Sequence, residues 1–209
     1  LPGDDPYDTA VVMASSATRA LRHGELTEGA DLARRAMSIA AHAEARLPAL
    51  EALADATLDE GLLDDSDAAF AELFDLGCRD GNDWYASSGA TGVMLVAAYA
   101  GRAPTRALDP TTFDDSAPVS ARAWLAYGQA ELLAAEEPAR AESSYREALS
   151  LARVAANRYI EGVSLASLAA LQARTGHASA LAAFRDAIEH WLDSADHAHQ
   201  VTTLRNLAV

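Results

Sequence analysis

The sequence repeats itself at a nearly fixed interval, and this constrains the fold more than any other feature. Glycines that follow alanine-rich stretches mark the period at Gly24, Gly61, Gly101 and Gly176. The intervals between them are 37, 40 and 75, and the last divides into 36 and 39 if a turn at Glu137 supplies the missing mark. Because a fixed period of about 20–50 residues is the signature of repeat architectures, we expect stacked copies of one small unit without a single central core.

Independent landmarks give the same period. The stretch "GNDWYAS" at 81–87 is echoed by "ANRYIEG" at 156–162, an offset of 75 in the numbering. Phe70 and Tyr145 are separated by the same offset. A third pair, "AESSYREALSLA" and "ALAAFRDAIEHW", begins at Ala141 and at Ala180, one period later. Agreement among unrelated landmarks makes chance a poor explanation of the period.

Every segment between these marks predicts a helix. The chain holds 50 alanines, and alanine is the strongest helix former. Apolar or small residues recur at helical spacing, and no segment alternates with the period of two that indicates a strand. The predicted first helices of the units are 11–21, 47–58, 87–100, 120–135 and 159–173. The predicted second helices are 28–42, 66–76, 139–155 and 178–192.

Helix ends are predicted from cap chemistry. The four period-marking glycines suit C-terminal caps, because glycine accepts a positive φ. Pro138 suits the first turn of a helix, where its missing N–H has no partner to lose. Asp67, Ser116 and Asp196 stand where N-caps are expected.

One unit is irregular. Residues 101–118 contain Pro104, Pro110 and Pro118, and a continuous helix cannot pass Pro110 without losing a hydrogen bond. We therefore expect the third unit's second helix to be short, displaced or partly unwound. The region is either a hinge or boundary, or a loop that has merely drifted. The predicted organisation is N-terminal repeats over 1–100, a proline-rich connection over 101–118, and C-terminal repeats over 119–209 that are cut at their end.

A helix pair of this length, with a small residue four positions before an aromatic ring, resembles the tetratricopeptide repeat (TPR). Residues 124–128 read W-x2-Y-G, 141–145 read A-x3-Y, and 180–184 read A-x3-F. The period exceeds the usual 34 or so, the closing proline is missing, and Glu131 replaces a tyrosine. The resemblance implies an all-α fold, a right-handed TPR-like superhelix of about five helix hairpins plus a final helix.

Residues 156–209 are similar to the C-terminal repeat region of large actinobacterial transcriptional regulators. These are the LuxR-type and SARP-type proteins with a STAND-class nucleotide-binding domain, whose repeats resemble those of MalT. The resemblance implies a regulatory or sensor module, with the DNA-binding and ATP-binding domains elsewhere in the parent chain. No G-x4-G-K-[ST] phosphate loop is present, and the chain has no lysine to complete one. The alternative is a free-standing TPR adaptor that binds peptide tails.

The net charge, the apolar stretches and the single cysteine limit the classes of partner that we expect. The net charge is −15, and all 16 basic residues are arginine. An acidic segment repels phosphate backbones, so we expect no direct nucleic-acid binding. No stretch approaches the length of a membrane span. Cys78 is the single cysteine, which cannot form an internal disulfide and favours a reducing, cytoplasmic setting. We expect a protein or peptide partner or a small-molecule effector, no cofactor, and self-association through the C-terminal end.

In such a repeat, first-helix side chains that are not needed for stacking are free to bind. The candidate binding residues are the polar positions of the last first helices, although ordinary solvated surface is the alternative. They are Arg122, Gln129, Arg158, Glu161, Ser164, Gln200 and Thr203.

Other chemistry is weakly supported. His190, His197 and His199 lack the ligand spacing of a zinc site. The stretch 80–83 resembles a calcium loop but fails at its sixth and twelfth positions, so we expect a capped turn. The acid pairs at 64–65 and 114–115 suit helix starts. Cys78 has no evident base and is expected to be a buried thiol. We predict no catalytic and no metal-binding residues.

Overall fold

The structure is a computed structural model that describes residues 5–40, 42–106, 113, 116–194 and 196–207. These residues form ten α-helices, and none of them lies in a strand. The expected all-α class is therefore confirmed. The chain divides into two compact units, Leu1–Pro110 and Thr111–Val209, and each is described by itself.

Each unit holds five of these helices. Unit 1 contains α1 (Pro6–Arg22), α2 (Leu26–Ile39), α3 (Ala43–Asp59), α4 (Leu63–Asp80) and α5 (Asp83–Ala100). Unit 2 contains α6 (Val119–Leu133), α7 (Pro138–Val154), α8 (Arg158–Arg174), α9 (Ala180–Ser194) and α10 (His197–Leu207). We call α1, α3, α5, α6, α8 and α10 the first helices, and α2, α4, α7 and α9 the second helices.

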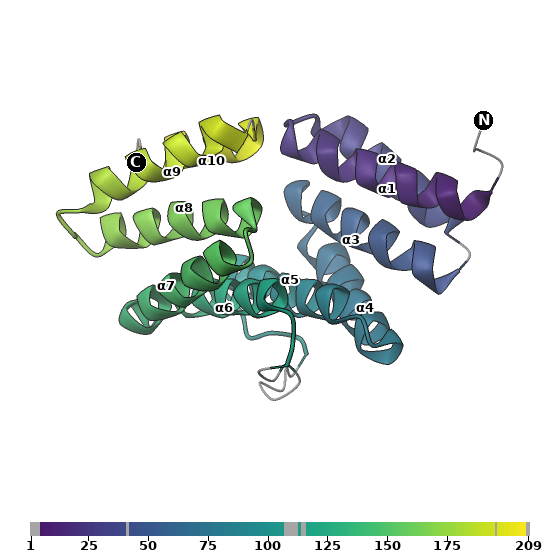
Figure 1. Cartoon of the computed structure of the whole chain (residues 1–209), viewed down its shortest axis with the longest axis horizontal. Coiled ribbons are helices and arrows are strands. Elements are labelled where there is room, and N and C mark those ends of the chain that lie inside the picture. Colours follow the sequence, from purple (N-terminus) through teal and green to yellow (C-terminus); the bar gives the residue numbers. More distant parts are fainter. Residues whose placement is uncertain (1–4, 41, 107–112, 114–115, 195, 208–209) are drawn as a thin grey trace. The chain divides into compact units, whose positions relative to one another are not determined.

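The helices pack in the same order in both units. Each helix contacts the next one along the chain within its unit, as the antiparallel pairs in Figure 1 show. Each first helix also contacts the following first helix, so α1, α3 and α5 form one series and α6, α8 and α10 another. This nearest-neighbour pattern is typical of helical repeats. A TPR-like superhelix remains a prediction.

Six of the ten described helices end with the same C-terminal cap, namely α1, α3, α4, α5, α7 and α8. The glycines at all four predicted cap positions, and Gly81 as well, have φ between 61° and 82°. In each case the residue after the glycine donates its N–H to the carbonyl five residues earlier, as from Glu25 to Ala20. Ala156 holds the sixth such position with φ 51°, and Asn157 donates to Ala152 in the same way. The predicted glycine caps are confirmed.

The helix starts agree in part with the predicted N-caps. Pro138 is the first residue of α7 as expected, and the side chain of Asp196 accepts a hydrogen bond from the His199 N–H at 3.2 Å. The prediction of an N-cap at Asp67 is wrong, because this residue lies within α4. The prediction for Ser116 is wrong as well, since Pro118 occupies the position before α6. Leu62, whose side chain makes no capping hydrogen bond, precedes α4 instead.

The expected second helix of the third unit is missing from residues 101–106. These residues are non-helical and are anchored to α4 by polar contacts. Thr105 donates a hydrogen bond to Asp67 at 2.6 Å, which is why Asp67 is buried within α4. Arg102 reaches the same carboxylate at 3.5 Å, and the Arg106 guanidinium lies 5.5 Å from the centre of the Phe74 ring. Pro110 lies outside the described residues, and a hinge at 104–118 remains a prediction.

Small residues allow the close approach of successive helices in unit 1. Alanines of α1, α2 and α3 form one core cluster, and larger side chains of α3, α4 and α5 form a second. An added Cβ at Gly89 of α5 would lie 2.3 Å from the backbone nitrogen of Phe74 in α4. At Gly92 it would lie 2.1 Å from the Phe70 ring. The α4–α5 contact therefore requires glycine at both positions.

We predict that Gly89→Ala destabilises the protein although alanine favours a helix. The added methyl would collide with backbone, which cannot rotate away, so the free energy of unfolding should fall by about 1–3 kcal/mol. Gly29→Ala is the matched control, because the nearest atoms belong to the flexible Leu21 side chain. Chemical denaturation should show a clearly smaller loss for Gly29→Ala, and equal losses would contradict this account.

We also predict that Ala156→Gly raises stability. Alanine at φ 51° is strained, and the left-handed conformation costs an L-residue roughly 1–2 kcal/mol. Relief of that strain should exceed the entropy cost of glycine and leave a net gain of about 0.5 kcal/mol. Ala155→Gly, at φ −77°, should lower stability instead. Opposite signs in thermal unfolding are the expected result, and a loss in both variants would refute the strain.

Candidate functional site

A group of polar residues on the first helices of unit 1 forms the best-defined candidate site. We call it the carboxylate site, and it comprises Glu51 and Asp55 of α3, Trp84 and Ser88 of α5, and Arg22 of α1. The Ser88 hydroxyl donates a hydrogen bond to the Glu51 carboxylate at 2.7 Å. The Arg22 charge and the Trp84 side chain also act on this carboxyl group, and both lower its pKa. The site therefore joins all three first helices of the unit.

Local sequence explains why these side chains share a surface. Glu51 and Asp55 are four residues apart on α3, and Trp84 and Ser88 are four residues apart on α5. Side chains four apart lie above one another on a helix, so each pair forms a ridge. Contact between α3 and α5 brings the two ridges together. Glu51, Asp55 and Trp84 remain partly exposed, so they can meet a partner.

Both carboxyl groups have a raised pKa. Desolvation by the surrounding protein is the main cause for Glu51, and the Ser88 hydrogen bond and the Arg22 charge oppose it. The pKa of Asp55 is raised well above its ordinary value by desolvation first, and then by the charges of Glu51 and Asp59. A desolvated, repelling carboxylate pair stabilises a nearby cation, because the cation offsets both effects.

The carboxylate site is absent from the sequence-based predictions. A signal for it exists in Glu51, Asp55 and Asp59, acidic residues that recur every four positions in an alanine-rich helix. The acid pairs that were predicted at helix starts are not part of the carboxylate site. Asp64 and Asp65 do lie in the first turn of α4 as expected, whereas 114–115 lies outside the described residues.

Five of the seven predicted binding residues lie wholly or partly at the surface of unit 2. Gln129 and Arg158 are exposed. Arg122, Glu161 and Gln200 are half-buried. Glu161 forms an ion pair with Arg153 of α7 at 2.9 Å, a contact that links α7 to α8.

Ser164 and Thr203 were expected to have side chains that are free to bind, but neither side chain reaches the surface. Ser164 is 0% exposed and Thr203 is 2% exposed. The Thr203 hydroxyl accepts a hydrogen bond from the Trp191 indole N–H at 3.1 Å and donates to the His199 carbonyl at 2.8 Å. Ser164 and Thr203 are one period apart and occupy equivalent places in successive first helices. Both face neighbouring helices and serve packing.

An aromatic cluster connects the first helices of unit 2. Trp124 of α6 stacks on Tyr127 with ring centres 5.1 Å apart, and its ring also lies 5.7 Å from that of Tyr159 on α8. The Tyr159 ring meets the edge of His199 on α10 at 5.3 Å. Trp124 and Tyr159 are half-buried, so part of this cluster is available to a partner.

Glu131, the departure from the TPR pattern, has a packing role in unit 2. Tyr145 of α7 is buried beside Glu131 of α6. Desolvation of Tyr145, followed by the negative charge of Glu131, raises the pKa of the tyrosine. The carboxylate thus lies near the α6–α7 contact, where the rings of Tyr127 and Tyr145 are 6.1 Å apart.

The remaining chemical candidates are dispersed. Cys78 was expected to be buried, but it is exposed, because the buried face of α4 is made by neighbours such as Leu76 and Gly77. His190 contacts the Arg158 carbonyl, and His199 contacts Asp196. The side chain of His197 is outside the described part of the chain. Among the described residues, no three potential metal ligands gather.

The predicted calcium-like stretch is a helix junction. Gly81 has φ 65°, and the Asn82 side chain accepts a hydrogen bond from the Tyr85 N–H at 3.3 Å. This confirms the expected capped turn.

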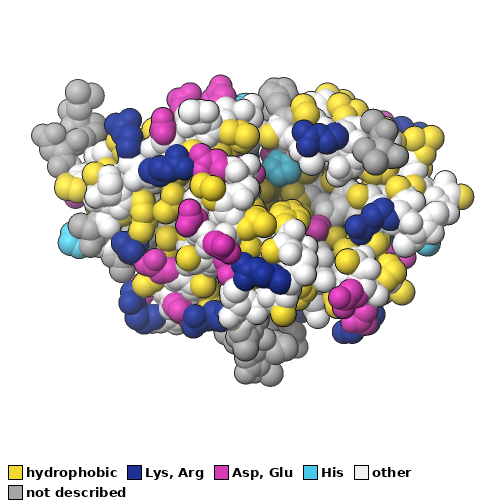
Figure 2. All heavy atoms as spheres, turned by 180° about the vertical axis from the view of Figure 1, so that it is seen from behind, with side chains coloured by type: hydrophobic (Ala, Val, Ile, Leu, Met, Phe, Trp, Pro, Cys, Tyr) yellow, Lys and Arg dark blue, Asp and Glu magenta, His cyan; other side chains and the backbone are white. Residues whose placement is uncertain are grey.

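The charged surface is mixed in sign. On the face shown in Figure 2, arginine and acidic side chains are interspersed and form no large basic area. Many arginines lie in ion pairs between neighbouring helices, including Arg46 with Glu72 at 2.6 Å. In the described part of the chain, no helix combines the length and the apolar character that crossing a bilayer requires.

We predict that the carboxylate site makes stability depend on pH. The folded protein holds protons on Glu51 and Asp55 above their ordinary pKa values of 4.5 and 3.8. Stability is therefore greatest below those values and falls as pH rises towards the raised pKa values. Asp55→Asn should flatten this fall and raise stability at neutral pH, measured by denaturant unfolding across the acidic to neutral range. Asp65→Asn, at an exposed position of α4, should keep the wild-type slope; a matching change there would contradict the assignment.

Comparison with known proteins adds no assignment. No protein-family model matches the chain. No curated protein matches it either.

Proposed function

We propose that this chain is a non-catalytic helical-repeat module of a larger bacterial transcriptional regulator, and that it binds a protein or peptide segment on its first helices. The packing order carries the proposal: within each unit the first helices contact one another in series. A series of parallel helices offers an extended surface whose side chains can differ from unit to unit without loss of stacking. The link to a regulator rests on the sequence resemblance of residues 156–209.

The chemistry of the surface supports a peptide partner. In unit 1, the Glu51 and Asp55 carboxylates suit a lysine or arginine side chain, since a cation would relieve their desolvation and repulsion. In unit 2, Trp124 and Tyr159 present partly exposed rings that suit apolar or cationic side chains. A small-molecule effector is the second candidate ligand, and no cofactor is required for either role.

Dispersed reactive groups support a non-catalytic role. An active site needs a nucleophile or base within reach of the group that activates it. Cys78 is exposed on α4, and His190 and His199 contact different partners. The mixed surface charge also argues against direct nucleic-acid binding, which uses gathered basic residues.

We predict that peptides selected from a random display library bind the first helices of unit 1 and are enriched in basic residues. The double variant Glu51→Gln, Asp55→Asn should weaken their binding about tenfold or more, because the charge partners of the cation are removed. Titration calorimetry gives the dissociation constants. Asp65→Asn is the control and should bind as the wild type does.

Binding at the first helices would be refuted if the selected peptides bind three variants as tightly as the wild type. These are the double variant, Trp124→Ala and Gln129→Ala. The genomic reading frame separates the two protein-level hypotheses. Continuation into DNA-binding and nucleotide-binding domains is expected for the regulator, whereas a frame limited to these repeats would favour a free-standing adaptor.

A further inference from the structure

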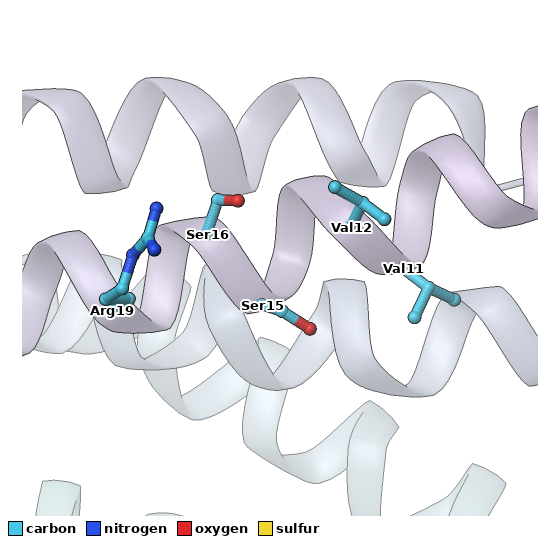
Figure 3. Close-up of a pocket in the computed structure, with 5 residues that line it drawn as sticks. All are labelled: Val11, Val12, Ser15, Ser16 and Arg19. Carbon is cyan, nitrogen blue, oxygen red and sulfur yellow. The ribbon is translucent and has the colours of Figure 1, made fainter. Parts of the chain in front are cut away.

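The outward face of α1 carries a stripe of four exposed residues. Asp8, Val12, Ser15 and Arg19 are spaced by four, three and four residues, so they lie along one side of the helix. Val12 is 64% exposed, which is high for a valine. An open depression of about 330 Å³ on this helix is lined by Val12, Ser15 and Arg19 together with Val11 and Ser16. Figure 3 labels these five residues. All five lining residues belong to α1.

The repeat identifies this stripe as a packing face. The caps at Gly24 and Gly61 have the same hydrogen bonds, so each position of α1 corresponds to the α3 position whose number is higher by 37. The α3 equivalents of the stripe are buried, at most 1% exposed, and belong to the core cluster shared with α1 and α2; they are Ala45, Ala49, Ala52 and Ala56.

The next first helix uses the same face. The caps Gly61 and Gly101 are 40 residues apart, so each α3 position corresponds to the α5 position whose number is higher by 40. The α5 equivalents of Ala49, Ala52 and Ala56 are Gly89, Gly92 and Val96. These three are buried, and the two glycines lie against the α4 residues Phe70 and Phe74. The face of a first helix that packs on the preceding hairpin is thus the same at α3 and α5. The α1 stripe is the corresponding face, and it is exposed.

The α1 stripe differs from the others by having opposite charges at its two ends. Asp8 and Arg19 occupy positions that are alanine in α3, and neither forms an ion pair within the described residues. Arginines near the junctions of other helices are paired, as Arg34 is with Glu60 at 2.5 Å and Arg153 with Glu161 at 2.9 Å. A helix that docks on α1 is therefore expected to supply a carboxylate to Arg19 and a cation to Asp8.

A second α1 helix supplies both. In an antiparallel pairing centred between Met13 and Ala14, Asp8 of one copy lies opposite Arg19 of the second copy. Val12 then lies opposite Ser15, and Val11 opposite Ser16. The short serine side chains allow close approach of the two helices, and the valines fill the contact. The sequence of the stripe is complementary to itself in the antiparallel direction only.

We propose that the outward face of α1 is a self-association site, at which two copies of this chain pair their α1 helices about a twofold axis. Such an isologous contact uses each interaction twice, so two Asp8–Arg19 ion pairs flank a small apolar centre. A contact made by one helix from each copy belongs to the small-interface class, below about 1,200 Å², and the dimer is expected to be weak and to dissociate on dilution.

Charge reversal with complementation tests the proposal in the 209-residue chain. Asp8→Arg and Arg19→Glu each place like charges opposite each other twice, so each dimer dissociation constant should rise about tenfold or more in sedimentation equilibrium. An equimolar mixture of the two variants should regain dimer at the wild-type level. In that heterodimer, the two substituted side chains face each other with opposite charges at one end, and the native Arg19 faces the native Asp8 at the other.

Arg35→Glu on α2 is the matched control, since it makes the same charge change at another exposed arginine of unit 1 and should dimerise as the wild type does. Circular dichroism checks that every variant stays folded. A wild-type chain that stays monomeric over the accessible concentration range overturns the proposal. If the single variants dimerise as the wild type does, the proposal is also overturned. The contact would then lie at another surface, such as the exposed Val201 and Leu204 of α10. A mixture that fails to recover overturns the antiparallel register.

Discussion

The packing of each first helix on the hairpin before it is the interaction on which the rest of the structure depends. A single helix hairpin of this size cannot bury its own apolar face, so each one is stable only against a neighbour. In unit 1 the contact is made by alanines of α3 and by Gly89 and Gly92 of α5. Small residues bring the helix axes close, and dispersion contacts between backbones then replace those of large side chains. This explains how an alanine-rich chain with few aromatic residues forms a core.

The same constraint shapes the polar surface. When first helices lie side by side, the side chains on the face left uncovered meet those of the next first helix. Glu51 of α3 thus meets Ser88 of α5, and Trp124 of α6 meets Tyr159 of α8. The two units use this shared geometry for different chemistry: desolvated carboxylates in one and aromatic rings in the other. In a stack of this kind, the residues at these positions can change without any change in the packing face.

Polar contacts also compensate where the repeat is interrupted. Residues 101–106 follow α5 but form no helix that could pack on α4. The segment instead contacts α4 through the side chains of Arg102, Thr105 and Arg106. Hydrogen bonds to charged groups are stronger than those between neutral groups. The segment is therefore fixed to unit 1 by charge and hydrogen bonding, where the regular units use apolar packing.

Local physics makes much of the architecture predictable from the sequence. The period, the helix positions and the glycine caps follow from helical spacing and from the ability of glycine to adopt positive φ, and both depend only on residues close together in the chain. The predictions for Gly24, Gly61 and Pro138 are correct for this reason. Asn82 and Asn157 follow the same rule, because an N-cap bonds to a backbone N–H three residues away.

Only the tertiary structure decided which face of each helix is covered. The predictions of an exposed Ser164 and Thr203 and of a buried Cys78 are wrong, because polarity alone does not say which side of a helix meets its neighbour. Asp67 is no cap, since its side chain binds Arg102 and Thr105, which are 35 and 38 residues away in the chain. The carboxylate site depends on Glu51 and Ser88, which are also distant in sequence, and on desolvation, which is a property of the assembled helices. The sequence by itself determined the helices and the glycine caps that end several of them, whereas their stacking determined which side chains remain exposed.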